Sequence, residues 1–279
     1  MTQPVPNGTA VLHRKGEYMA IIGAVLGDIA GSQYEFDRPK DLDHINCPLF
    51  SEQCSFTDDS VMSLAIKSAL DNNRPYQDEM RRIGFRYPLC GYGGHFFDWI
   101  FCTDPRPYNS FGNGSAMRVS YIGEYFDSLD KVKEEAEKSA KVSHNHPEGI
   151  KGAVVTAACV WMARHGKNKE EIYQYVMEEY PEERYKFSGK DMVYLQKNYS
   201  WDVTCMTSVP VAMRCLYEST SYISFLRNVF SMDCDCDTLC AIGGGVAEEI
   251  YGGTGLKEDK ILRHYLDDEL YEILNYSCK

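Results

Sequence analysis

The amino-acid sequence predicts an all-α fold of a single domain, and three observations support that prediction. Apolar residues recur at helical spacing along most of the chain. Strand-like alternation is scarce, and the Asn-Gly pair at residues 113–114 lacks the alternating apolar flanks of a hairpin. The chain has 279 residues, 44% of them hydrophobic, and no repeat or low-complexity linker divides it. Amphipathic helices bury their apolar stripes against one another, so we expect one helical bundle.

The N-terminal segment, residues 1–18, is expected to be a loose extension, because it holds two prolines and few candidates for a core. The domain then occupies residues 19–279, and its first helix begins at Ala20. In that helix three glycines recur every fourth residue and therefore share one face, at positions 23, 27 and 31. Glycine disfavours a helix but lets a neighbouring backbone approach closely, so this face predicts tight helix packing.

The later elements follow from the same periodicity. We expect loops around a short helix in the glycine-rich, aromatic stretch 86–118, and a polar, Tyr-rich segment over residues 181–200. Apolar spacing predicts further helices over residues 61–71, 127–142, 149–165, 169–180, 208–230 and 237–251, and after Lys257.

Charge and cysteine content limit the classes of partner. The net charge of −12 repels nucleic acid and anionic membrane surfaces, so we expect neither as a main partner. An anionic substrate would need a local countercharge, such as a bound metal. The 11 cysteines are irregularly spaced, no secretory leader pattern opens the chain, and the run around Asp28 is too short and too polar to span a membrane. Reduced thiols and a cytoplasmic location are expected.

An acidic cluster opens the helix that is predicted near residue 61. Thr57, Asp58 and Asp59 stand in a row there, in "SFTDDS". A single residue of this kind would be an ordinary helix cap, because its oxygen accepts backbone N–H groups and its charge suits the helix dipole. Two adjacent carboxylates repel one another unless a cation lies between them.

The same construction recurs far downstream, in "DCDCDTLCAIGGG". Asp233, Asp235 and Asp237 alternate, and Thr238 follows at the start of a helix rich in small residues. Carboxylate and hydroxyl oxygens are ligands that Mg²⁺, Mn²⁺ and Ca²⁺ prefer. If the two helix starts meet in space, they can hold one or two divalent ions; otherwise they are two unrelated caps.

The cysteines of this segment offer a rival, a zinc site. Cys234, Cys236 and Cys240 lie close together in the sequence, and thiolates favour Zn²⁺. Their spacing is not Cys-x-x-Cys, and no second pair lies at zinc-ribbon distance, so we disfavour zinc.

Two glycine-rich loops and a histidine segment are further candidates. "CGYGGHF" and "FGNGSAMR" expose backbone N–H groups that can cradle a phosphate, although each is also typical of a connecting loop. "SHNHPEG" holds His144 and His146, which alone indicate only a tight loop end. Glu35 follows the glycine-faced helix, and beside a metal cluster it could act as a general base or position water. Serine-hydrolase and P-loop signatures are absent from the sequence.

Taken in order, "GDIAGSQYE", "FTDDS", "GYGG", "GNGSAMR", "SHNHPEG" and "DCDTLCAIGGGVAEEIYG" resemble the ADP-ribosylglycohydrolase family, from about Ala20 to about Gly253. The resemblance implies an orthogonal all-α bundle with a cleft that holds two Mg²⁺ or Mn²⁺ ions. It implies a catalytic or gating role for Glu35. It implies metal ligation by Thr57, Asp58, Asp59, Asp235, Asp237 and Thr238. It implies ADP-ribose binding by Gly93, Gly94, Asn113, Gly114, Ser115, Met117 and His144.

Departures from the family pattern are few. Cys234 stands where the family usually has glycine, and Ser60 stands where it usually has threonine. A glycine can adopt backbone angles that a cysteine resists, so this position bears on how Asp235 is presented.

The resemblance implies a metal-dependent hydrolase that removes ADP-ribose from a modified protein side chain. Glu35, Asp58 and Asp237 are the candidate catalytic residues, with Glu35 or an aspartate taking the proton of the attacking water. Arginine is the favoured acceptor, because an acidic cleft suits a guanidinium leaving group. A serine-linked substrate, O-acetyl-ADP-ribose, or silent binding of ADP-ribose are the alternatives. The expected partners are the ADP-ribosylated protein and the product ADP-ribose, and we expect a monomer.

Overall fold

The computed structural model describes residues 19–275, and within them it confirms the all-α prediction. An isolated β-bridge joins Gly112 to Thr204, and no strand forms in the described range. The division into an extension and a domain stays a prediction, since residues 1–18 lie outside the described residues. The helices are α1 (Ala20–Ser32), α2 (Asp58–Asp71), α3 (Tyr76–Gly84), α4 (Gly94–Phe101), the 3-10 helix η1 (Asn113–Ser115), α5 (Ser120–Tyr125), α6 (Leu129–Lys141), α7 (Pro147–Arg164), α8 (Lys169–Glu179), α9 (Met192–Asn198), α10 (Cys205–Tyr217), α11 (Tyr222–Phe230), α12 (Cys236–Tyr251), α13 (Glu258–Tyr265) and α14 (Asp268–Asn275).

Most predicted helices are present, with shifted ends. The predicted segment 208–230 contains two helices, α10 and α11, and the C-terminal tail likewise contains α13 and α14. Two short helices, α3 and α9, were not expected. Their buried apolar residues are few, Met80 and Ile83 in α3 and Met192 and Leu195 in α9, so each pattern is too short to stand out in the sequence.

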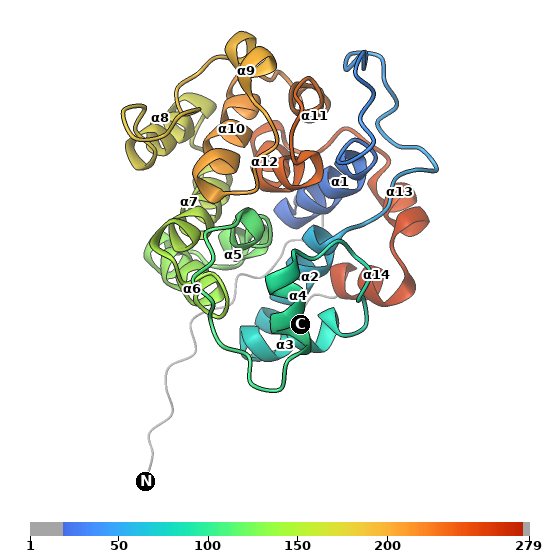
Figure 1. Cartoon of the computed structure of the whole chain (residues 1–279), viewed down its shortest axis with the longest axis vertical. Coiled ribbons are helices and arrows are strands. Elements are labelled where there is room, and N and C mark those ends of the chain that lie inside the picture. The colour runs from blue at the N-terminus through green and yellow to red at the C-terminus, as the bar shows by residue number, and fades with distance from the viewer. Residues whose placement is uncertain (1–18, 276–279) are drawn as a thin grey trace.

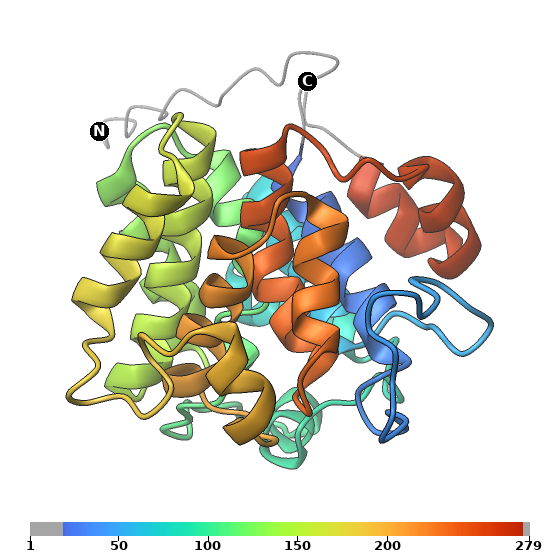
Figure 2. The same cartoon turned by 90° about the horizontal axis from the view of Figure 1, so that it is seen from above.

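Helices α1 and α12 form the central pair of the fold, and both are buried along most of their length. They lie side by side in Figures 1 and 2, with α2, α5, α7, α10 and α11 packed around them. The predicted glycine face makes the contact. A Cβ atom on Gly27 would lie 2.4 Å from the carbonyl oxygen of Cys240, and one on Gly31 would lie 2.6 Å from the Cα atom of Asp237. The backbones therefore touch where α1 carries Asp28.

The start of α2 lies against the same pair. Thr57 is its N-cap, and the Thr57 hydroxyl accepts the Asp59 N–H at 3.2 Å, as the capping interpretation predicts. The Thr238 hydroxyl, in the first turn of α12, donates to the Asp59 carboxylate at 3.1 Å. The two acidic helix starts thus meet in space, which sequence alone left open.

Candidate metal centre and adjoining cavity

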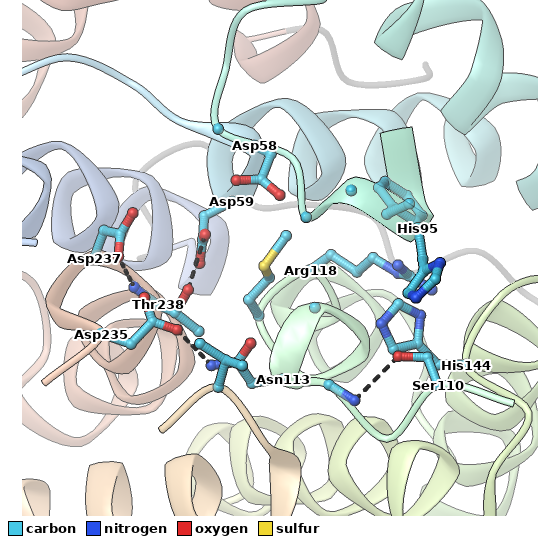
Figure 3. A pocket seen from close by; sticks show the side chains of 18 of the residues that line it. Asp58, Asp59, His95, Ser110, Asn113, Arg118, His144, Asp235, Asp237 and Thr238 are labelled. Atoms are coloured by element: carbon cyan, nitrogen blue, oxygen red, sulfur yellow. Dashed lines mark hydrogen bonds between the residues drawn. The ribbon is translucent and has the colours of Figure 1, made fainter. Parts of the chain in front are cut away.

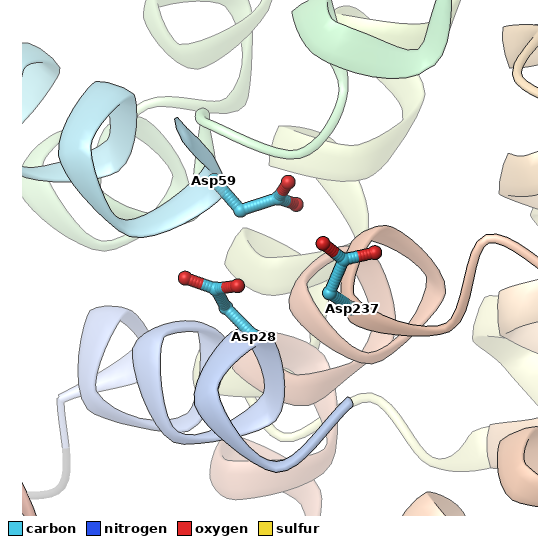
Figure 4. A group of neighbouring side chains, drawn as sticks. All are labelled: Asp28, Asp59 and Asp237. Carbon is cyan, nitrogen blue, oxygen red and sulfur yellow. The ribbon is translucent and has the colours of Figure 1, made fainter. Parts of the chain in front are cut away.

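Carboxylates from α1, α2 and α12 and from the loop after α1 converge on one point. Oxygen atoms of Asp28, Asp59 and Asp237 lie within 4.8 Å of one another, and so do those of Glu35, Asp235 and Asp237. Figure 4 shows the first group, with one aspartate from each of three helices. Asp237 belongs to both groups. Together with Asp58, these residues are called the acid cluster below.

Asp28 is the member that the sequence interpretation missed. It is fully buried, and the hydroxyl and the backbone N–H of Thr57 donate to its carboxylate at 2.7 and 3.0 Å. The Ser60 N–H donates to it at 3.0 Å, and the Ser60 hydroxyl donates to it as well. An acidic residue inside an otherwise apolar helix was the available signal, but it served only as evidence against a membrane span.

The predicted ligands take different positions around the two groups. Asp59, Asp235 and Asp237 supply oxygens to the two groups, and Thr238 reaches them through its hydrogen bond to Asp59. Thr57 is turned toward Asp28 and orients that carboxylate.

Asp58 lies apart from the two groups but lines the same cavity. Its N–H donates to the Cys90 carbonyl at 2.7 Å, which fixes the "CGYGG" loop to the start of α2. Gly91 has a φ of +89°, and a Cβ atom there would lie 3.5 Å from the Asp58 carboxylate. Such a backbone angle favours glycine, so the loop can follow this path beside the acid cluster.

Burial raises the pKa of every carboxylate in the acid cluster. Burial is the main cause for Asp58, Asp59 and Asp237, whose pKa values lie well above the ordinary range, and neighbouring carboxylates add to it. Burial, followed by the charge of Asp235, raises the pKa of Glu35 to about 7. Such a site is costly to keep unless protons or cations neutralise it.

The acid cluster fits a hard divalent cation. Its donors are all carboxylate and hydroxyl oxygens, which Mg²⁺ and Mn²⁺ prefer. The Oδ1 atom of Asp59 is buried and has no hydrogen-bond donor among the described residues. A buried oxygen without a partner is expensive, and a cation would satisfy it.

A cavity of about 400 Å³ adjoins the acid cluster. Figure 3 shows its two ends: aspartates from α2 and α12 with Thr238 on one side, and Arg118, His95 and His144 on the other. The cavity is therefore lined by acidic side chains at one end and by the cationic side chain of Arg118 at the other. Residues that line it include Glu35, Asp58, Gly91, Gly93, Gly94, Asn113, Gly114, Met117, Arg118 and His144.

Arg118 is the second residue that the sequence interpretation missed. Its side chain is fully buried, and no carboxylate of residues 19–275 lies within ion-pair distance. Its Nη2 donates to the Ser139 carbonyl at 3.0 Å and to the Ser143 hydroxyl at 3.2 Å, while Nε and Nη1 have no partner within the described chain. Burial lowers its pKa to about 10, so it stays charged at neutral pH. A buried unpaired guanidinium favours an anion beside it.

His144 lies between Arg118 and the second glycine loop. Its Nδ1 contacts the Ser143 hydroxyl at 2.8 Å, and burial, followed by the charge of Arg118, holds its pKa well below the usual range. It is therefore neutral at pH 7. A Cβ atom on Gly114 would lie 3.3 Å from its Nε2, so the loop packs closely on the ring.

Six of the seven predicted ADP-ribose contacts line the cavity, and Ser115 does not. The Ser115 side chain is fully buried, and its hydroxyl donates to the Gly149 carbonyl at 2.7 Å, which holds the loop against α7. Asn113 lines the cavity and also supports the acid cluster, because its amide donates to Asp235 at 2.7 Å and to Ser208 at 3.0 Å. The roles of these residues in binding ADP-ribose stay predictions.

The cysteine segment forms no metal group with other side chains. Neither of the two candidate groups found in the described residues contains a cysteine, which argues against the zinc alternative. Cys234 and Asp235 keep negative φ angles, since Asn73 and Asn109 alone among the described non-glycine residues have positive values. Asp235 is thus presented without the backbone conformation for which glycine would be needed.

Comparison with known proteins identifies the family. The model of the ADP-ribosylglycohydrolase family matches residues 18–275. The chain belongs to the ADP-ribosylglycohydrolase family. A solved structure titled "ADP-ribosylglycohydrolase-related protein complex" covers 91% of this chain and 92% of its own, with a TM-score of 0.69 and 18% identity, which shows the shared fold.

Relatives of this chain include "ADP-ribosylhydrolase ARH3" of Homo sapiens, which is 28% identical over 186 residues. That match covers 55% of this chain and 51% of the human protein, so it spans about half the length of that relative. The Mus musculus protein of the same name is 25% identical, over 83% of this chain and 82% of its own. "Putative ADP-ribosyl glycohydrolase L543" of Acanthamoeba polyphaga mimivirus is 24% identical, over 84% and 86%.

None of the helices between residues 19 and 275 combines the length and apolar character that a membrane crossing requires.

Proposed function

We propose that this protein is a metal-dependent hydrolase that cleaves the glycosidic bond between ADP-ribose and a modified protein side chain, with arginine as the favoured acceptor. One observation carries the proposal. A single cavity has the acid cluster at one end and the buried, unpaired Arg118 at the other. ADP-ribose has a matching polarity, with a ribose that carries the scissile bond and a diphosphate next to it.

The cationic end supports binding of the diphosphate. Arg118 lines the cavity, and its Nε and Nη1 atoms have no hydrogen-bond partner in the described chain. A guanidinium group can bind phosphate oxygens through such donors. Gly93 and Gly94, at the start of α4, line the cavity, and a Cβ atom on either would meet nothing within 4 Å. Backbone N–H groups at a helix start favour anions. Arg118 and these backbone N–H groups would allow a chain of net charge −12 to hold an anionic substrate.

The acid cluster would hold the metal ions, proposed to be two Mg²⁺ or Mn²⁺. Asp28, Asp59, Asp235, Asp237 and Thr238 would contact them, with Asp58 and Glu35 beside them. Divalent ions in such a site lower the pKa of a bound water and polarise substrate oxygens.

Glu35 is the best candidate to move the proton of the attacking water. It lies beside Asp235 and Asp237 and lines the cavity, and its pKa of about 7 is suited to exchange of a proton near neutral pH. Asp58 and Asp237 would act by holding the reacting groups. His144, neutral and hydrogen-bonded, would orient the substrate without adding charge.

The test is release of ADP-ribose from two peptides, one modified on arginine and one on serine, each with Mg²⁺, with Mn²⁺ and with excess EDTA. The proposal expects release from the arginine peptide that EDTA abolishes, and loss of release in Asp237→Ala. Release from serine alone would keep the hydrolase and overturn the acceptor. No release from either peptide would overturn the proposed activity on modified proteins.

A further inference from the structure

An aromatic pair stands exposed at the mouth of the cavity. Phe36 is 76% exposed and Trp201 is 39% exposed, and their rings stack with centroids 5.4 Å apart and planes inclined by 29°. Both side chains line the cavity. Large aromatic side chains are usually buried in a core or an interface, so a stacked pair that faces solvent beside a site calls for a partner.

The pair lines the cavity beside members of the acid cluster. Phe36 directly follows Glu35, whose carboxylate lies in one group with Asp235 and Asp237. Trp201 belongs to the loop before α10, and that loop is fixed to the site because the Asn113 N–H donates to the Val203 carbonyl at 2.8 Å. The Asn113 amide in turn donates to Asp235. Both aromatic residues are therefore held beside the acid cluster.

The proposed orientation of ADP-ribose decides what meets the pair. If the diphosphate lies near Arg118 and the scissile bond near the acid cluster, the acceptor side chain leaves on the far side of the acid cluster. Phe36 and Trp201 line the cavity and are tied to the acid cluster through Glu35 and Asn113. They are thus placed against the acceptor rather than against the nucleotide.

The charge of this end favours a cationic acceptor. Five of the six carboxylates of the acid cluster line the cavity, so their negative charge faces the acceptor at this end. The faces of tryptophan and phenylalanine also attract cations, and guanidinium groups stack on them more often than ammonium groups do. Aromatic faces and this negative charge together match an arginine side chain and the backbone around it.

We propose that Phe36 and Trp201 form an acceptor platform that selects ADP-ribosylated arginine, in its peptide context, over smaller or uncharged leaving groups. The proposal rests on the proposed hydrolase activity. The platform contributes through ring stacking on the guanidinium and on apolar neighbours in the peptide. These two side chains are specificity residues rather than catalytic residues.

The experiment compares kcat/KM on three substrates that share ADP-ribose: an arginine-modified peptide, the same peptide modified on serine, and O-acetyl-ADP-ribose. The variants are Phe36→Ala, Trp201→Ala and the double variant. The matched control is Phe85→Ala, because Phe85 is 47% exposed and pairs with Phe101 at 4.7 Å but does not line the cavity. Trp201→Phe, which keeps an aromatic face, tests rescue.

The platform predicts that each alanine variant lowers the ratio of kcat/KM for the arginine peptide to that for O-acetyl-ADP-ribose by about 3- to 10-fold. The loss should lie mainly in KM, Trp201→Phe should restore most of the ratio, and the control should match the wild type. An equal loss on both substrates would mean that the pair only supports the loops, and it would overturn the platform, as would an unchanged ratio. If the wild type releases ADP-ribose from serine alone, the platform fails while the hydrolase stands. If it releases none from any substrate, both fail.

Discussion

The contact between α1 and α12 yields the sharpest stability prediction. Gly27→Ala adds one methyl group where the built Cβ lies 2.4 Å from the Cys240 carbonyl oxygen, about 1 Å short of an ordinary contact. The neighbouring atom is backbone inside a buried helix, so no side-chain rotation relieves the clash. The helices must separate, and they carry Asp28 and Asp237 of the acid cluster.

The magnitude follows from two opposed effects. Alanine in place of glycine favours a helix by about 1 kcal/mol. Overpacking a core costs about 1–3 kcal/mol, and a rigid backbone neighbour places this case near the upper end, about 3 kcal/mol. The net loss in the free energy of unfolding is then about 2 kcal/mol, which lowers the Tm of a chain of this size by about 4–8 °C. A shift of about 1 Å between the ligands also exceeds the tolerance of a metal site of about 0.2 Å, so affinity for Mn²⁺ should fall at least about 10-fold.

The assays are urea unfolding in EDTA for the stability, and calorimetric titration with Mn²⁺ for the affinity. Gly94→Ala is the control for stability, because a Cβ atom there meets nothing within 4 Å, and its free energy of unfolding should stay within about 0.5 kcal/mol of the wild type. A Gly27→Ala protein as stable as the wild type would refute the reasoning, because the contact between α1 and α12 would then have room for a methyl group that the structure does not show.

Four further predictions concern the site. Asp58→Ala and Asp237→Ala should each abolish turnover and weaken metal binding, as measured by ADP-ribose release and Mn²⁺ titration. Full activity in either variant would contradict the proposal that the acid cluster is the metal centre. Glu35→Gln should lower kcat while Mn²⁺ affinity changes little, and unchanged kinetics would exclude Glu35 as the proton carrier. Arg118→Met should weaken ADP-ribose binding by at least about 10-fold while adenosine binding changes less, because a charge-assisted contact to phosphate is lost; equal losses for both ligands would point to a folding role. In EDTA the free energy of unfolding should fall as pH rises from about 4 to about 7. The reason is that carboxylates with a raised pKa, such as Glu35 at about 7, still hold their protons in the folded chain when the unfolded chain has released them. Mn²⁺ should reverse that fall, and a flat profile in EDTA would show that the acid cluster is not strained by its charge.

Much of the fold could be predicted because long helices carry their own periodic signal. The glycine face of α1 indicated close packing, but no pattern in the sequence predicted that α12 would be the helix packed against it. That pairing depends on a match between Gly23 on α1 and Gly244 on α12, where each backbone fills the space that a Cβ atom would need on the other. Short helices such as α3, with two apolar anchors, are set by the surrounding packing and gave little warning.

The candidate site was predictable where residues were adjacent and unpredictable where folding gathers them. Thr57, Asp58 and Asp59 are consecutive in the sequence, so they can be recognised as a cluster. Asp28 does not, because its neighbours in sequence are apolar and its partners, Thr57 and Ser60, come from another helix. Arg118 was likewise hidden, since only the structure shows that no carboxylate reaches it.

Asp28 and Arg118 also explain how an acidic protein can serve an anionic ligand. Asp28 is the member of the acid cluster that does not line the cavity, and Thr57 and Ser60 donate hydrogen bonds to its carboxylate. Its charge therefore adds to the attraction for cations without facing the cavity. Arg118 lies at the opposite end, beside the neutral His144, and two of its nitrogen atoms have no hydrogen-bond partner in the described chain. The net charge of −12 therefore says little about the local field, because opposite charges are separated along one cavity. This separation of charge along the cavity favours a ligand that has negative charge near its middle and a sugar at one end.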